Sequence, residues 1–277
     1  MKKYRFTLVS VFIFICMSLT GCGLIDTALV KVGLKNTDFD YLLQNKVDKI
    51  IIQSSRDAGF RFIVNDQSAI QNIYKILSKG NIKDEKTSLD PDYVFEIYMG
   101  DEVKSYNYVV SVDERGVGNF YDENNSYLVS KSLDDSITQN LSFIRKPREF
   151  EDIYYNSILQ VLELKKDELS KGDNKVGIDI TGDVDCLKYM FSVDLKKFEK
   201  NLNKIVEGTR LINNNSEEFD TVITVKNKGY SSKKFRTVIT VDNKKDKVYE
   251  TYYVVGNYEY KSWDIYIGNP GEKPDEW

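Results

Sequence analysis

Carboxylates are the side chains most able to do chemistry in this chain, because its 277 residues include no histidine. Histidine is the commonest general base, and its absence excludes catalysis by Ser-His-Asp and Cys-His groups. Three aspartates lie close together in the sequence, at Asp179, Asp183 and Asp185. Oxygen ligands of this kind suit a hard cation such as Ca²⁺, but the spacing of an EF-hand loop is absent. Solvated loop acids are the plainer interpretation, and we expect no metal.

Other catalytic motifs are missing or badly placed. Ser231–Lys234 has the serine and lysine spacing of penicillin-recognising enzymes, but it lies in a predicted hairpin turn. Gly116–Gly118 lacks the third glycine of a dinucleotide-binding loop. Paired carboxylates can hydrolyse glycans, yet with 43 acidic residues the sequence selects no pair. We therefore predict no catalytic residue and no cofactor, with a carboxylate-dependent cell-wall glycan hydrolase as the alternative function.

One cysteine points to lipid chemistry. Residues 1–5 carry three positive charges, and the largely apolar stretch Phe6–Leu19 follows them. This is the pattern of a secretory signal, and it is too short for a spanning helix of about 20 residues. The stretch ends in Leu19–Cys22, an aliphatic residue and two small residues before a cysteine. That motif resembles the lipobox of bacterial lipoproteins, which implies a chain cut before Cys22 and lipidated there.

Charge and cysteine content describe the rest of the predicted mature chain. Lys and Arg number 39 against 43 for Asp and Glu, so no basic excess indicates nucleic acid. Loss of residues 1–21 removes three cations and leaves 36 − 43 = −7. We therefore expect attachment to the membrane through lipid rather than surface charge. Cys186 would be the one remaining thiol, so no intrachain disulfide can form, and we interpret it as structural.

Aromatic residues crowd the last predicted strands and offer the best candidate binding surface. Tyrosine is common at interfaces, but it is also a good strand former, and the structural interpretation is favoured. The candidate binding residues are Tyr252, Tyr258, Tyr260 and Trp263. A similar group in the first half contains Tyr93, Tyr98, Tyr106, Tyr108, Tyr121 and Tyr127.

The elements that position these residues follow an internal repeat. Residues 50–98 resemble residues 178–226 at a constant offset of 128. Asp66 and Asp194 each precede a one-sided apolar stripe and are predicted to cap a helix. Gly80 and Gly208 follow where a helix needs a left-handed residue.

Alternating apolar residues predict strands around both helices. We expect them at 49–54, 60–64, 93–99, 106–112 and 126–130, and again at 175–181, 187–193, 221–226, 235–241, 249–255 and 263–267. The expected fold class is α+β, with two related modules, each an antiparallel sheet covered by one helix, joined by a connecting helix. The expected organisation is a signal peptide (1–21), a tether (22–45), module 1 (46–146), the connecting helix (147–172), module 2 (173–268) and a frayed tail (269–277).

Two strands resemble a known domain type. Asp92–Tyr98 after Pro91, and Tyr127–Ser130, are similar to the YhfM-like domains of uncharacterised Gram-positive lipoproteins, over roughly residues 45–145. The resemblance implies location and fold and carries over no catalytic residue. We therefore expect a non-enzymatic lipoprotein on the extracytoplasmic face of the cell membrane that binds a protein or cell-wall partner.

Overall fold

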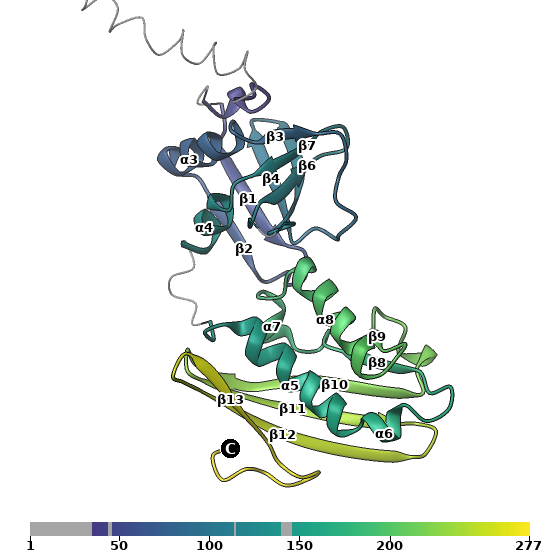
Figure 1. Ribbon diagram of the computed structural model, residues 1–277. Helices are drawn as coiled ribbons and strands as arrows, with labels where there is room; N and C mark the ends of the chain where they lie inside the picture. Colours follow the sequence, from purple (N-terminus) through teal and green to yellow (C-terminus); the bar gives the residue numbers. More distant parts are fainter. Residues whose placement is uncertain (1–34, 44–45, 114, 140–145) are drawn as a thin grey trace, which may run out of the picture. The chain divides into compact units, whose positions relative to one another are not determined.

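The computed structural model describes residues 35–43, 46–113, 115–139 and 146–277, and its architecture is mixed α+β (Figure 1). The chain forms two compact units. The first comprises the described parts of Met1–Ile52 with Phe62–Ser88 and Val94–Ser136, and the second comprises Gln53–Arg61, Leu89–Tyr93 and Ile137–Trp277. The predicted signal sequence and Cys22 lie outside the described residues. Within the described ranges, no helix is long and apolar enough to cross a membrane.

A seven-stranded sheet forms the first unit, in the order β2-β1-β4-β5-β6-β7-β3. Its strands are β1 Lys49–Ser54, β2 Arg61–Val64, β3 Asn81–Lys83, β4 Tyr93–Met99, β5 Glu102–Val109, β6 Gly118–Tyr121 and β7 Ser126–Val129. The strands from β5 to β3 are antiparallel neighbours. β1 and β4 are antiparallel too, because Asp48 N–H donates to the Tyr98 carbonyl while Ser55 N–H donates to the Asp92 carbonyl.

Helix α3, Gln67–Leu77, confirms the first predicted helix and its cap. The carboxylate of Asp66 accepts the Ala69 N–H at 2.9 Å, which satisfies one of the free donors at the helix start. The predicted apolar stripe is buried. The predicted left-handed glycine is wrong: the C-cap is Ser78 and Gly80 does not have a positive φ. A Cβ on Gly80 would instead lie 3.1 Å from Val129, so this glycine allows close packing.

Part of the predicted tether belongs to the core of the first unit. Phe39 and Leu42 are 0% and 1% exposed, and the Phe39 ring lies 4.8 Å from that of Tyr127. The Asn36 amide donates to the carbonyl of Leu77 at 2.9 Å. A short 3₁₀ helix, η1 Asp40–Leu43, and helix α4, Ser132–Gln139, complete the unit. Four of the six tyrosines grouped in the first half are buried, namely Tyr93, Tyr106, Tyr108 and Tyr127.

The second unit contains a six-stranded mixed sheet, in the order β13-β12-β11-β10-β8-β9. The strands are β8 Val176–Asp179, β9 Arg210–Leu211, β10 Thr221–Tyr230, β11 Lys234–Asn243, β12 Val248–Glu259 and β13 Ser262–Ile267. β10 to β13 form an antiparallel meander, but β8 runs parallel to both β10 and β9. The prediction of a purely antiparallel sheet is therefore wrong here, since a helical crossover returns the chain in the same direction.

The strands of the two sheets follow the same order, but the first strand of each sheet runs in a different direction relative to its neighbour. β1-β4-β5-β6-β7 occupy the same sequence of places as β8-β10-β11-β12-β13. The difference arises before the central helix. In the first unit the hairpin strand β2 reverses the chain, whereas the strand predicted at 187–193 is replaced by helix α7, Val184–Leu187, and the start of the next helix at Ser192. The first strand is thus antiparallel to its neighbour in one sheet and parallel in the other.

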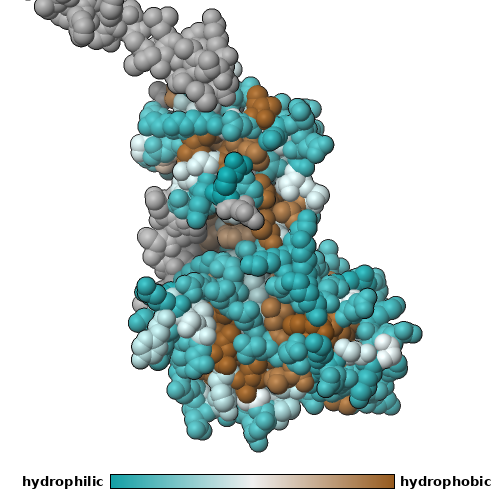
Figure 2. Space-filling model, viewed as in Figure 1, coloured by the Kyte–Doolittle hydropathy of each residue, from teal (hydrophilic) through white to brown (hydrophobic). Residues whose placement is uncertain are grey.

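Two long helices cover one face of the second sheet (Figure 1). They are α5 Phe150–Leu164, which α6 Lys166–Leu169 follows, and α8 Ser192–Ile205; η2 Ser216–Glu218 is a short 3₁₀ helix. The predicted connecting helix is α5, and its apolar side packs into the core of this unit. Figure 2 shows apolar residues among hydrophilic ones over this helix layer.

The two ends of α8 test the predicted cap at Asp194 and the predicted left-handed glycine at Gly208. Asp194 lies in the first turn and does not cap the helix, because the N-cap is Phe191. Gly208 has a φ of 79° and confirms the left-handed glycine predicted after this helix.

The predicted frayed tail is bound to the sheet. The N–H groups of Gly268 and Gly271 donate to carbonyls of β12 at 3.1 and 2.8 Å. The ring of Trp277 packs edge-on against Tyr253, with centroids 4.8 Å apart. Glu276 lies 3.3 Å from the Lys234 ammonium. The tail therefore covers part of the outer face of β11 and β12.

Candidate binding site at the β12–β13 hairpin

Two turns and one loop of the second unit meet at the same end of its sheet. Because β10 to β13 form a meander, the β10–β11 turn and the β12–β13 turn lie at one end. The Arg148 N–H, just before α5, donates to the Ser232 carbonyl at 3.2 Å. The Tyr258 N–H donates to the Lys233 carbonyl at 2.8 Å. These backbone bonds hold the three segments together. Ser231–Lys233 connects β10 to β11, which confirms the predicted hairpin turn.

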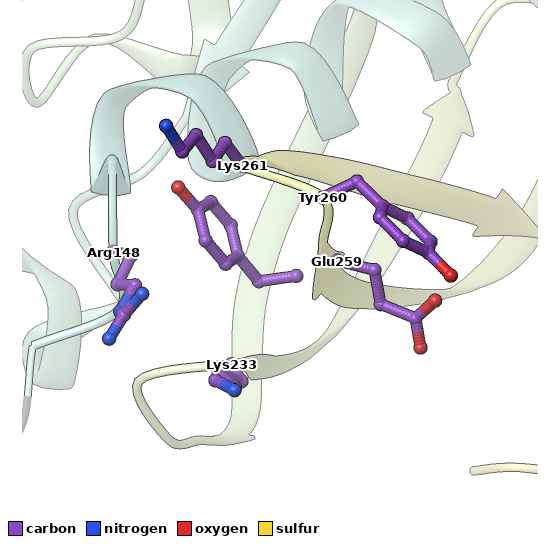
Figure 3. Close-up of a pocket in the computed structure, with 6 residues that line it drawn as sticks. Arg148, Lys233, Glu259, Tyr260 and Lys261 are labelled. Carbon is purple, nitrogen blue, oxygen red and sulfur yellow. The ribbon is translucent and has the colours of Figure 1, made fainter.

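The segments surround an open depression of about 500 Å³ (Figure 3). It is lined by Arg148, Lys233, Tyr258, Glu259, Tyr260 and Lys261. In Figure 3 the side chains of Tyr260 and Glu259 project to one side of the hairpin, and Arg148 lies on the other side, toward which Lys261 points.

The floor of the depression is supported by two predicted aromatic residues. Tyr258 and Trp263 pack edge to face with ring centroids 5.3 Å apart. The Trp263 indole N–H donates to the Arg148 carbonyl at 2.7 Å, and the Tyr258 hydroxyl donates to Glu149 at 3.1 Å. The Arg148 guanidinium lies 5.6 Å from the centre of the Tyr258 ring, a cation–π contact. The supporting side chains therefore have defined positions.

Tyr260 is displayed on a turn that its residue type does not favour. Tyr260 and Lys261 have φ values of 50° and 65°, in the left-handed region that two-residue hairpin turns require. Asparagine and glycine usually occupy such positions, and other residues cost about 1–2 kcal/mol each. The Tyr260 side chain is 98% exposed, so no packing compensates for this cost. Backbone strain without a packing reason is a sign of function.

The lining is cationic. It contains three cations, at Arg148, Lys233 and Lys261, against one carboxylate, Glu259. The neighbouring Lys234 forms an ion pair with Glu276 in the tail. Among the residues that the structure describes, no carboxylate lies within ion-pair distance of the three lining cations. The depression is therefore a local positive surface on a chain with a net charge of −4.

Tyr252 is separate from the other aromatic candidates. It is 4% exposed, and its hydroxyl donates to Glu250 at 2.9 Å. It belongs to the core of the second unit. The three lining cations were not among the predicted site residues, because each comes from a different loop and no local motif joins them.

Two of the three aspartates, Asp179 and Asp183, have separate structural roles. Asp179 accepts the Thr181 N–H at 2.9 Å in a local turn. Asp183 is 3% exposed and accepts from the Tyr154 hydroxyl and the Asn227 N–H. Burial raises the pKa of Asp183. Within the described ranges, no three acidic or cysteine side chains lie together as a metal site would require, so the calcium interpretation of this acidic group finds no support.

Two further groups are chemically distinctive. Burial, and then the nearby carboxylate of Glu151, raise the pKa of Asp194 to about 6. Cys186 is fully buried, and burial raises the pKa of its thiol, so the thiolate that would act as a nucleophile is disfavoured. The cysteine is best interpreted as a small core residue.

One comparison with known proteins finds a match, and it covers part of the first half of the chain and a few residues beyond it. The family model described as YhfM protein matches residues 43–147. The resemblance seen in the two strands of the first half is thereby confirmed at the level of this domain. No curated protein and no solved structure matches the chain. The depression lined by residues of the β10–β11 turn, the β12–β13 turn and Arg148, here called the hairpin-tip site, lies wholly beyond the matched residues.

Proposed function

We propose that this chain is a lipid-anchored, non-enzymatic binding protein on the extracytoplasmic face of a Gram-positive cell membrane, and that the hairpin-tip site contacts a protein or cell-wall partner. The signal-like residues 1–21 and Cys22 support the proposed location on the membrane. The exposed Tyr260 on a strained turn, beside three cations that form no ion pair with any carboxylate in the described part of the chain, supports the binding role. Two units of the same strand order favour their being related modules.

Processing and anchoring are tested on the full chain in a Gram-positive host. We expect the wild-type protein in the membrane fraction, with mass spectrometry showing a chain that begins at a lipid-modified Cys22. The Cys22→Ala variant should lose the lipid and leave that fraction. An unmodified, full-length wild-type chain in the cytosol would overturn the address.

Binding is tested by crosslinking on intact cells. Wild-type protein should recover a protein or wall fragment that Tyr260→Ala does not recover. The control is Tyr249→Ala, which removes another exposed tyrosine, 67% exposed, at the opposite end of β12. Recovery that is equal for all three proteins, or consistently absent, would contradict the binding role.

The hydrolase remains the alternative, and Asp194 beside Glu151 is the observation in its favour. A carboxyl group with a pKa near 6 suits a general acid in glycan hydrolysis. An in-gel assay with wall material distinguishes the two functions. Clearing by the wild type that is lost in Asp194→Asn would replace the binding role with hydrolysis.

A further inference from the structure

We propose that the hairpin-tip site binds an anionic sugar or polyol polymer, with its negative groups on Arg148, Lys233 and Lys261 and a ring or polyol face on Tyr260. This inference rests on the proposed binding function and names its ligand class. The relevant contacts all lie within the second unit.

Charge is the first step of the argument. The whole chain has more acidic than basic residues, 43 against 39, yet the lining has three cations and one carboxylate. A positive surface on an acidic protein attracts anions to that place. The arginine fork suits phosphate or carboxylate, and the two lysines act as point charges.

The composition of the lining is the second step, and it argues against a protein ligand. The six lining residues include no aliphatic side chain. Protein interfaces usually have an apolar core with a polar rim, and this surface has no such core. An exposed tyrosine ring next to polar groups suits a ligand that has both a flat carbon face and many hydroxyl groups.

Shape is the third step. A small molecule is usually held in an enclosed, largely apolar cavity. This depression is open, and Tyr260 projects to the side of the hairpin opposite Arg148 (Figure 3). A ligand that touches both must extend across the hairpin. A linear polymer can do so.

The test measures binding of the full chain, held in neutral detergent micelles, to purified polymers. The probes are poly(glycerol phosphate), polygalacturonate and neutral dextran, with polyglutamate and phosphatidylglycerol vesicles as competitors of other classes. We expect at least one anionic polymer to bind and dextran to bind far more weakly; the pair of anionic probes tells phosphate from carboxylate. With three cations engaged, a rise from about 50 to about 200 mM salt should weaken binding about 15–60-fold, a log–log slope of about −2 to −3.

Variants assign the binding to this site. The Lys233→Gln/Lys261→Gln double variant should flatten the slope by about 2, since each lost anion contact removes about 1. Tyr260→Ala should weaken binding with the slope unchanged. The controls are Lys196→Gln/Lys245→Gln, which removes two exposed lysines of this unit outside the site, and Tyr249→Ala. Both controls should bind as the wild type does.

Several results would overturn the inference. These are dextran binding as tightly as the anionic polymers, polyglutamate or phosphatidylglycerol vesicles binding more tightly than either polymer, and control variants that lose as much as the site variants. If no polymer binds but crosslinking on cells still gives a Tyr260-dependent partner, this inference fails and the binding function stands. If neither experiment gives a Tyr260-dependent ligand, both fail.

Discussion

Replacing the strained turn should stabilise the protein while it removes binding. The perturbation is Tyr260→Asn/Lys261→Gly, which installs the residues that a two-residue hairpin turn with two positive φ values prefers. A stability gain with a functional loss is the signature of residues kept for function rather than for folding.

The expected gain follows from the geometry. Each left-handed residue that is not Gly or Asn costs about 1–2 kcal/mol. Tyr260 is 98% exposed, so its loss removes almost no buried apolar surface. Glycine at 261 gives the unfolded chain more conformational freedom, which reduces the stabilisation by about 0.5–1 kcal/mol. The net change in the free energy of unfolding is about +1–3 kcal/mol for the two residues together, and each kcal/mol corresponds to about 2–4 °C in Tm for a protein of this size.

The assay is thermal and urea unfolding of the wild type and three variants, with polymer binding measured on the same samples. The double variant should unfold later and bind more weakly. Tyr260→Ala should keep wild-type stability within about 0.5 kcal/mol, because it removes an exposed ring and retains the Cβ that causes the strain. Lys261→Gly alone should show part of the gain. A lower Tm for the double variant would refute the strain argument, and undiminished binding would refute the functional one.

Three further predictions concern groups whose roles the structure defines. Folding raises the pKa of Asp194 from about 4 to about 6. The contribution of this carboxyl group to the free energy of unfolding is therefore greatest at low pH and falls as the pH rises through this range. The stability of the wild type relative to Asp194→Asn should thus fall by about 1–2 kcal/mol between pH 4 and pH 7, after allowance for partial exposure, and a flat difference would contradict this. Asp183→Ala leaves two buried donors, on Tyr154 and Asn227, without an acceptor, and should cost about 2–4 kcal/mol in urea unfolding; a cost below about 1 kcal/mol would show that water replaces the carboxylate. Asn36→Ala removes the amide that ties the segment before η1 to the end of α3, and should cost about 1–2 kcal/mol, with faster hydrogen exchange at residues 36–43 as the specific readout.

Local patterns predicted the elements whose causes are local. Asp66 and the apolar stripe after it predicted α3 because a cap and a helical period depend only on residues a few positions apart. The strands β1 and β4 were predicted at their observed bounds, since alternation with a following turn at Gly100 is equally local. The prediction of a strand at 187–193 was wrong. A short apolar alternation of this kind also occurs in helical segments, and here tertiary packing favoured the helical conformation.

The composition and linear motifs of the chain also predicted an address, through Cys22, and excluded histidine chemistry. Neither prediction depends on the fold, because a processing enzyme would read the motif in an extended chain and a missing residue type is missing in every conformation.

The binding site depended on tertiary structure. Tyr252 and Tyr258 are both tyrosines of β12 and, being six residues apart, lie on the same face of the strand. Tyr252 is in the core and Tyr258 lines the site, because Tyr258 is at the end of the strand, beside the turns. Arg148, Lys233 and Lys261 come from three loops, and only the meander and the packing of α5 bring them together. Periodicity in the sequence reports which side of an element is apolar, whereas which loops become neighbours follows from long-range strand pairing, which the sequence does not mark locally.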